Sequence, residues 1–436
     1  KAIAFAGIPG EVAAIAHISK NYARFSLVED LKPAIRLARK GFAADQAFVL
    51  ALEKFSSILQ KSPQSGRIFF DKGQIPSPGY TIVQEDLADI LEAIGYEGRE
   101  GFYEGKTAEK LVEGVNQLGG NWLLEDLKKY QVKIRKPLKA NFRDWTITTV
   151  PPPSAGGLTI LTSLRVLDRF EEDPLSTSDR IHLIVESFRR AHCDRVRFVS
   201  DPDFYKTPDA LTTDTHIEQL RDSIEFFKAS NAKTFPCEPL SNHGNTTHFS
   251  IIDKEGNRVA ATLSINDFFG TGLMVPGTGI LLNNELADFS FADKKSPNRL
   301  ESSKRPVSSM SPLFLESSDT LAILGTPGGL RIPSMLLLAI LAAEEGQAPK
   351  QWLKNPRFHF NFTQNVIEYE SGAFSQPVKN ALQLRGHQLK EVEPYGNMQL
   401  VYLDKKNEIL SAFSDPRWFG KAMVQTASSS DTLRVN

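Results

Sequence analysis

The feature that most constrains the fold is a change of sequence pattern near Asn245. Before this point apolar residues recur at helical spacing, twice between residues 154 and 198 and also over residues 11–23, 31–42, 86–98 and 107–120. After it, residues 247–253 and 258–266 predict two strands joined by the turn KEGN. A helix-rich part followed by a strand-rich part predicts a layered α/β or α+β fold.

The strand-rich part contains one segment whose pattern changes from strand to helix. Residues 320–334, TLAILGTPGGLRIPS, predict a strand, a glycine-rich turn and a helix start. The apolar run at residues 335–343 predicts a buried helix and is far too short to span a bilayer. Residues 278–290 are a candidate further strand, and the polar residues 291–305 predict a mobile surface loop. Short strands return after residue 355, and SSSDT near the end predicts a loose tail.

Composition excludes several classes of partner and site. Lys plus Arg (51) nearly balances Asp plus Glu (52), so the chain lacks a global field suited to nucleic acid or an anionic membrane. The two cysteines, Cys193 and Cys237, form no CxxC motif, although a disulfide between them is conceivable. The eight histidines show no ligand spacing of the HExxH kind. We therefore expect no metal site and no nucleic-acid partner.

The tandem threonines Thr246 and Thr247 open the first predicted strand, directly after a polar loop. Threonine favours strands, so this position needs no function to explain it. Asn245-Thr246-Thr247 is also a glycosylation sequon. A third reading is chemical, and it requires the chain to be cut between Asn245 and Thr246.

An amino-terminal threonine carries both a nucleophile and a base. A hydroxyl is a weak nucleophile unless a base lies beside it, and the free α-amino group of the same residue can be that base. Its unperturbed pKa of about 7.7–8.0 leaves a good fraction neutral near pH 7. The Thr246 hydroxyl could make the cut itself, by attacking the preceding carbonyl to give an ester that water then opens.

Eleven short strings occur in order over nearly the whole chain and carry a family resemblance. They are GIPGEVA (7–13), PAIRLARKGF (33–42), FYEGKTAEKL (102–111), PPPSAGG (151–157), SDPDF (200–204), TTHFSIIDKEGN (246–257), PGTGILLNNELADFS (276–290), KRPVSSMSP (304–312), GTPGGLRI (325–332), NPRFH (355–359) and SDPR (414–417). One such string alone is weak evidence for a family, but eleven strings in the same order along the chain are specific evidence. The chain resembles the γ-glutamyltransferase family, a branch of the N-terminal nucleophile hydrolases that includes cephalosporin acylase-like members.

The resemblance implies a role for each of several residues. Thr246 would be the nucleophile, with Asn245–Thr246 as the processing site, and Ser264 would stand where the family has a threonine that bonds the nucleophile. Gly328 and Gly329 would point backbone N–H groups at the developing oxyanion. The substrate α-ammonium would be bound by Asn266, Glu285 and Asp288 through charge-assisted hydrogen bonds, and the α-carboxylate by Ser308 and Ser309.

The resemblance also implies an architecture and a reaction. The fold would be α+β, a four-layer αββα sandwich made as one chain. Residues 1–245 would form a helix-rich large part and residues 246–436 a strand-rich small part, intertwined through shared sheets. The enzyme would cleave γ-glutamyl donors such as glutathione and transfer the group to water, amino acids or peptides, without a cofactor or metal.

Assembly and location follow from the resemblance as well. The two parts come from one precursor, and a homodimer of processed units is one assembly that it allows. The family resemblance implies export to the periplasm or the cell exterior. No signal peptide is visible in the opening residues, so a cytoplasmic location stays open, and we expect that an N-terminal segment is missing.

Departures from the family pattern leave two alternatives open. The arginine that the family uses for the α-carboxylate is not found in this sequence, and the segment at residues 291–305 is short where relatives carry a lid. A Glu stands at 285, where the family often has Gln. A glutaryl or cephalosporin acylase would use the same nucleophile without the ammonium-binding set. A catalytically dead relative that serves as a scaffold would stay uncut.

Overall fold

The computed structural model describes residues 2–170, 175–231 and 244–425, and these residues form two compact units. The first unit comprises residues 1–134 and 263–287, and the second comprises residues 135–262 and 288–436. Each unit draws on sequence from both sides of Thr246. The compact units therefore do not follow the predicted large and small parts, whose boundary concerns chain cleavage and stays a prediction.

The first unit is almost entirely helical, as its sequence predicts. Its elements are η1 (Ala2–Phe5), α1 (Glu11–Tyr22), α2 (Leu27–Lys40), β1 (Phe42–Ala43), α3 (Gln46–Leu59), α4 (Pro63–Phe69), β2 (Thr81–Ile82), α5 (Glu85–Glu97), α6 (Glu100–Tyr103), α7 (Gly105–Gln117) and α8 (Leu124–Lys128). Helix α2 begins four residues before the predicted start at Leu31, because Ser26 and Glu29 form a capping box that satisfies the first N–H groups.

The segment at residues 263–287 supplies Val275 and Leu282 to the core of this unit. The predicted strand at residues 278–290 is wrong. Isolated bridges join Met274 to Leu281 and Ser290 to Arg299, and between them η4 (Glu285–Asp288) forms a short 3₁₀ helix. Thr278 explains the difference, because its hydroxyl donates to the Val275 carbonyl at 2.9 Å and accepts from the Ile280 N–H at 3.1 Å, which closes a turn.

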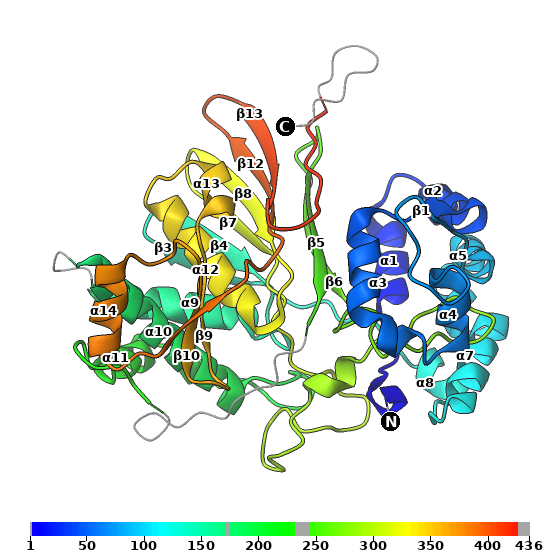
Figure 1. The fold of residues 1–436 in the computed structure, drawn as a ribbon, viewed down its shortest axis with the longest axis horizontal. Helices are drawn as coiled ribbons and strands as arrows, with labels where there is room; N and C mark the ends of the chain where they lie inside the picture. Colours follow the sequence, from blue (N-terminus) through cyan, green and yellow to red (C-terminus); the bar gives the residue numbers. More distant parts are fainter. Residues whose placement is uncertain (1, 171–174, 232–243, 426–436) are drawn as a thin grey trace. The chain divides into compact units, whose positions relative to one another are not determined.

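The second unit is built on a six-stranded antiparallel sheet (Figure 1). Its order is β13 (Ile409–Ser414), β12 (Gln399–Asp404), β8 (Thr320–Gly325), β7 (Leu313–Glu316), β4 (Trp145–Thr149) and β3 (Leu138–Phe142). Strand β4 precedes Thr246 in the chain and pairs with β7, which follows it. One sheet therefore contains strands from both sides of Thr246.

Three helices cover one face of this sheet: α9 (Gly156–Leu167), α10 (Thr177–Phe198) and α12 (Ile332–Glu344). Strand β8 contributes Ala322 and Leu324 to the core beneath them. Helix α12 is buried on nearly every side, as residues 335–343 predict, and each fully buried Leu or Ile side chain there stabilises the fold by about 1.5–3 kcal/mol.

The opposite face of β8 lies against β5 (Thr246–Ile252), which forms a two-stranded ribbon with β6 (Arg258–Ser264). The predicted hairpin is thus confirmed. Leu321 and Ile323 point to this face and are fully buried, so β8 is covered on both sides. At Gly325 a Cβ atom would lie 2.3 Å from His248 Nδ1, so that only glycine allows this approach.

The remaining elements of the second unit pack around this sheet. They are η2 (Asp168–Phe170), η3 (Asp209–Thr212), α11 (Asp214–Asp222), η5 (Gly329–Arg331), α13 (Pro349–Lys354), β9 (Phe358–Asn361), β10 (Val366–Glu370), α14 (Gln376–Leu384) and β11 (Leu389–Val392). Strands β10 and β11 pair in parallel and are joined by α14, a helix that the sequence analysis missed. Among the described residues no helix is both long and apolar enough to cross a membrane.

The prediction of a surface loop at residues 291–305 is wrong for three residues of the segment. Ser296, Asn298 and Lys304 are buried there. The Lys304 ammonium donates to the Pro297 carbonyl at 2.6 Å and to Glu301 at 2.8 Å, and these bonds satisfy a charge that would otherwise be too costly to bury. The predicted tail SSSDT and Cys237 lie outside the described residues.

Buried histidines predict that the protein loses stability in mild acid. Burial lowers the pKa of His248 and His387 to about 4 and that of His359 to about 3. Unfolded imidazoles titrate near pH 6.5, so between about pH 6.5 and 4 the unfolded chain binds more protons than the folded chain. The stabilisation that comes from these neutral histidines should be fully present above about pH 6.5. At pH 5 the free energy of unfolding should be lower by about 2 kcal/mol per such histidine.

Urea denaturation at pH 7.5 and pH 5 measures this effect. The midpoint should be lower at pH 5, and His387→Gln, which cannot take up the proton, should show a smaller difference. Equal midpoints at the two pH values would contradict the account.

Candidate active site

Thr246 is the first residue of β5 and is half-buried, whereas Thr247 is exposed. Successive side chains of a strand point to opposite faces, so Thr246 lies on the same face as His248 and Ser250. His248 is buried on that face and contacts Gly325 of β8. Thr246 is thus two residues along the strand from the contact that fixes β5 on the sheet.

His248 is held by two hydroxyl groups, one on each strand of the ribbon. Its Nδ1 lies 2.8 Å from the Thr262 hydroxyl of β6, and its Nε2 lies 2.9 Å from the Ser250 hydroxyl of β5. Burial keeps this imidazole neutral by lowering its pKa to about 4. His248 therefore fixes the ribbon beside Thr246 and is not poised to act as a base near pH 7.

Gly328 and Gly329 lie in the turn between β8 and α12, as predicted. Both have positive φ, 140° and 56°, which side-chain-bearing residues rarely adopt. A Cβ at Gly328 would approach Met335 Cε to 2.7 Å, so the turn is packed closely on α12. Backbone N–H groups in such a turn, just before a helix N-terminus, suit stabilisation of an anion.

A buried ionic network supports this turn and explains the strings NPRFH and SDPR. Arg357 bonds to Asp415 and donates to the Tyr395 carbonyl at 2.6 Å, while Asp415 accepts from the Met398 N–H at 3.0 Å. The loop held in this way donates the Asn397 N–H to the Thr326 hydroxyl at 3.3 Å. Two residues separate Thr326 from Gly329, so the network fixes the loop that borders the glycine pair.

Ser308 and Ser309 are held by the segment PPPSAGG, for which the sequence analysis assigned no role. The Ser308 N–H donates to the Pro153 carbonyl at 3.1 Å, and the Ser308 carbonyl accepts from the Ala155 N–H at 2.9 Å. At Gly156 a Cβ atom would lie 1.8 Å from Ser311 Oγ and 2.5 Å from the Ser309 carbonyl oxygen. Only glycine at position 156 permits the serine pair to sit where it does.

A buried arginine, Arg195 of α10, contacts this serine pair. Its Nη1 donates to Ser309 Oγ at 2.6 Å. Burial lowers the pKa of Arg195 to about 10, and the carboxylate of Asp288 opposes that change. Asp288 itself is tied to the serine loop by Asn298, whose side chain donates to the Asp288 carbonyl at 2.8 Å and accepts from the Val307 N–H at 3.1 Å.

The first unit carries the other three predicted residues: Ser264, Asn266 and Glu285. The Ser264 hydroxyl accepts from the Asn266 N–H at 2.8 Å, and the Asn266 side chain donates to the Asn284 carbonyl at 3.3 Å. Asn266 is a buried non-glycine residue with a φ of 71°. Such a conformation is uncommon, and these bonds hold it in place.

The structure therefore brings the predicted residues together in two groups. In the second unit, Asp288, Ser308 and Ser309 gather around Arg195, and the glycine pair follows the strand on which β5 rests. In the first unit, Ser264, Asn266 and Glu285 lie within one tightly bonded stretch of chain. Arg195 is not predicted by the sequence, because the charged run ESFRRAHCDRVR resembles a solvated helix face and gives no sign that Arg195 is buried.

One group of side chains in the second unit has spacing suited to a metal ion: His182, Glu186 and His387. His182 Nε2 faces the Glu225 carbonyl at 3.0 Å and must donate to it, so its Nδ1 accepts from His387 Nε2 at 2.8 Å. Glu186 bonds to Arg190 and accepts from the Ser230 N–H at 3.1 Å. These groups satisfy one another, and the neighbouring guanidinium disfavours a cation here.

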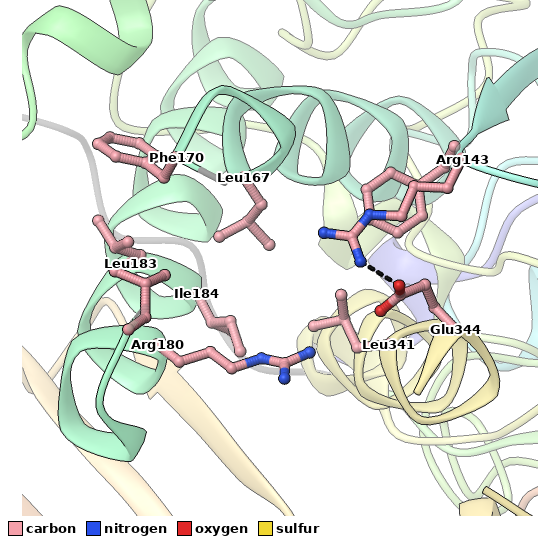
Figure 2. A pocket seen from close by; sticks show the side chains of 10 residues that line it. Arg143, Leu167, Phe170, Arg180, Leu183, Ile184, Leu341 and Glu344 are labelled. Atoms are coloured by element: carbon pink, nitrogen blue, oxygen red, sulfur yellow. Dashed lines mark hydrogen bonds and ion pairs between the residues drawn. The ribbon is translucent and has the colours of Figure 1, made fainter. Parts of the chain in front are cut away.

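A cavity of about 440 Å³ lies between α9, α10 and α12 (Figure 2). Seven of its ten lining residues are apolar, and the other three are Arg143, Arg180 and Glu344, of which Arg143 bonds to Glu344. The other arginine, Arg180, pairs with Glu345. Both guanidinium groups are thus neutralised, and none of the predicted site residues lines the cavity.

Gly156 provides a test of how closely the serine pair is packed. Gly156→Ala should destabilise the protein by about 2 kcal/mol or more, because the new methyl overlaps the backbone at Ser309. Gly66→Ala is the matched control, since nothing lies within 4 Å of a Cβ there and its position inside α4 favours alanine by up to about 1 kcal/mol. Urea denaturation should move the two midpoints in opposite directions, and similar midpoints for both variants would refute the packing described.

Comparisons with known proteins show the family of this chain. A family model described as gamma-glutamyltranspeptidase matches residues 1–425. The glutathione hydrolase proenzyme of Escherichia coli K12 is 32% identical over 429 residues, covering 94% of this chain and 73% of its own. The corresponding proenzyme of Pseudomonas sp. strain A14 is 33% identical over 411 residues, covering 91% and 72%.

Solved structures show the same fold. The crystal structure of cephalosporin acylase from Bacillus halodurans matches with a TM-score of 0.85 at 25% identity, covering 98% of this chain and 79% of that one. This match confirms the predicted N-terminal nucleophile hydrolase fold, the four-layer αββα sandwich. With the family model over nearly its whole length, the chain belongs to the gamma-glutamyltranspeptidase family.

Proposed function

We propose that this protein is a self-processing γ-glutamyltransferase and hydrolase with Thr246 as its nucleophile. The observation that carries the proposal is the position of Thr246 at the start of β5. That strand rests on β8, whose end leads into the glycine turn at 328–329. The proenzyme names of two relatives support synthesis as one chain that is later cut.

Processing comes first in the proposed mechanism. The Thr246 hydroxyl attacks the Asn245 carbonyl carbon, and the peptide C–N bond breaks, which leaves an ester and a free Thr246 amine. Water hydrolyses the ester, releasing the Asn245 carboxylate and restoring the hydroxyl. The chain then consists of residues 1–245 and 246–436, which stay associated because β4 and β7 pair within one sheet.

Catalysis uses the same hydroxyl together with the new amine. The amine takes the hydroxyl proton as Thr246 attacks the γ-amide carbonyl of the donor, and the N–H groups of Gly328 and Gly329 stabilise the oxyanion. The amine then passes its proton to the leaving nitrogen, and a γ-glutamyl ester remains. Water, an amino acid or a peptide amine attacks this ester and regenerates Thr246.

Substrate recognition in this proposal follows the roles that the family resemblance implies. Ser308 and Ser309 donate to the α-carboxylate, and Asn266, Glu285 and Asp288 accept from or surround the α-ammonium. Ser264 supports the Thr246 hydroxyl. No cofactor takes part in these steps, and the predicted export to the periplasm or cell exterior stays a prediction.

Thr246→Ala should leave the precursor uncut and lower activity by on the order of a thousandfold or more, because the substitution removes the hydroxyl nucleophile and the uncut chain lacks the free amine that is its base. The neighbouring exposed residue supplies the control, since Thr247→Ala should be cut and active within a few-fold of the unsubstituted protein. A denaturing gel and amino-terminal sequencing of the smaller fragment measure the outcome, and the fragment of the unsubstituted protein should begin Thr-Thr-His-Phe-Ser. Efficient cutting of Thr246→Ala, or an uncut but active protein, would refute the assignment.

The structural match to a cephalosporin acylase favours one alternative, an acylase for glutaryl side chains. A γ-glutamyl p-nitroanilide and a glutaryl p-nitroanilide differ only by the α-ammonium group. The three ammonium-binding residues predict a kcat/KM about tenfold or more in favour of the γ-glutamyl substrate, the size expected of charge-assisted hydrogen bonds. A preference for the glutaryl substrate would support the acylase instead.

A further inference from the structure

Arg195 differs from the other buried arginines of the second unit in what it bonds. Each of the other three among the described residues pairs with a carboxylate: Arg189 and Arg190 with Glu186, and Arg357 with Asp415. Arg195 is only 6% exposed, yet its side-chain hydrogen bond among the described residues goes to a neutral hydroxyl, Ser309 Oγ. Burying a cation is costly unless an anion compensates it. Among the described residues no carboxylate hydrogen-bonds this guanidinium, and Asp288 acts on it through its charge alone.

The hydroxyl of Ser309 is left with a proton to donate. A guanidinium has no acceptor, so Ser309 Oγ must be the acceptor of the bond from Arg195. The single Ser309 O–H then needs another acceptor, and none bonds it among the described residues. A hydroxyl that accepts from a cation is polarised and becomes a stronger donor, which suits an anionic acceptor.

Two more buried nitrogen atoms of α10 have no partner among the described residues. Arg195 Nε has no hydrogen-bond partner among the described residues, and neither does Nε2 of His192, one helical turn earlier on α10. His192 is completely buried, and the positive charge of Arg195 helps to keep it neutral. Asp288 is the carboxylate whose charge acts on Arg195. The Arg195 guanidinium thus has one hydrogen bond, to Ser309 Oγ, and a buried Nε–H that is left unpaired among the described residues.

We propose that Arg195 is a positioning residue that makes the Ser309 hydroxyl specific for the carboxylate of an acyl donor. Arg195 does not touch the donor. It orients the Ser309 oxygen and leaves the proton directed at the carboxylate. The ligand class is a donor whose acyl chain ends in a carboxylate, such as γ-glutamyl or glutaryl amides, and the inference rests on the proposed function.

Three p-nitroanilides separate this role from a structural one. The γ-glutamyl substrate carries both the carboxylate and the ammonium, the glutaryl substrate carries only the carboxylate, and the 4-aminobutyryl substrate carries only the ammonium. Arg195→Met should lower kcat/KM for the two carboxylate-bearing substrates by about tenfold or more, mainly through KM, and leave the third within about twofold. Arg195→Lys should recover part of the loss, because it keeps the charge.

A double-mutant cycle and a matched control test whether Arg195 acts through the Ser309 hydroxyl. Ser309→Ala should show the same substrate pattern, and adding Arg195→Met to it should cause little further loss, because both act on one hydroxyl. Arg189→Met removes another buried arginine of α10, whose contacts are Glu186, Asn365 and Phe360. It should lower stability without changing the ratio between the three substrates.

The outcomes decide between the proposal and its rivals. An equal loss on all three substrates, or no loss on any, overturns the role of Arg195. If Arg195→Met does not fold, Arg195→Lys and Ser309→Ala carry the same test. If the unsubstituted protein turns over none of the substrates, the proposed function fails, and calorimetry with glutarate, glutamate and 4-aminobutyrate tests Arg195 alone. Arg195→Lys must then weaken the first two ligands and not the third, and any other pattern overturns the inference.

Discussion

The close approach of β5 to the six-stranded sheet is the constraint on which the proposed chemistry depends. It exists because residue 325 has no side chain, so that His248 can occupy the space a Cβ would fill. His248 in turn bonds both strands of the ribbon and leaves Thr246 two residues from the contact. A strand held in this way positions its first residue by the packing of the sheet, which a flexible loop could not do.

Groups far from Thr246 in sequence fix the remaining parts of the site. Arg357 and Asp415 hold the loop that bonds Thr326, next to the glycine turn, and Gly156 admits the backbone of Ser309. These contacts are buried and paired, which makes them costly to break and keeps the small reacting groups in one geometry. The strings PPPSAGG, NPRFH and SDPR therefore hold in place the segments that carry the proposed site residues.

Local signals in the sequence predicted the hairpin at Thr246, the turn at Gly328 and the buried helix α12, because periodicity and glycine act within a few residues. The predictions failed where charged residues are buried, because the sequence pattern does not show that burial. Residues 291–305 look like a surface loop, yet Lys304 is buried by bonds to Pro297 and Glu301. The charged run on α10 looks solvated, yet it is buried and places Arg195 behind Ser309, a contact between residues 114 apart.

The central claim is that an amino-terminal threonine at position 246 accepts the acyl group. Mass spectrometry of the processed protein, quenched in acid during turnover of a γ-glutamyl p-nitroanilide, tests it most directly. The account predicts that the fragment beginning at Thr246 gains the mass of one γ-glutamyl group on its first residue. A modified residue elsewhere, or turnover by a fragment that begins at a different residue, would contradict it.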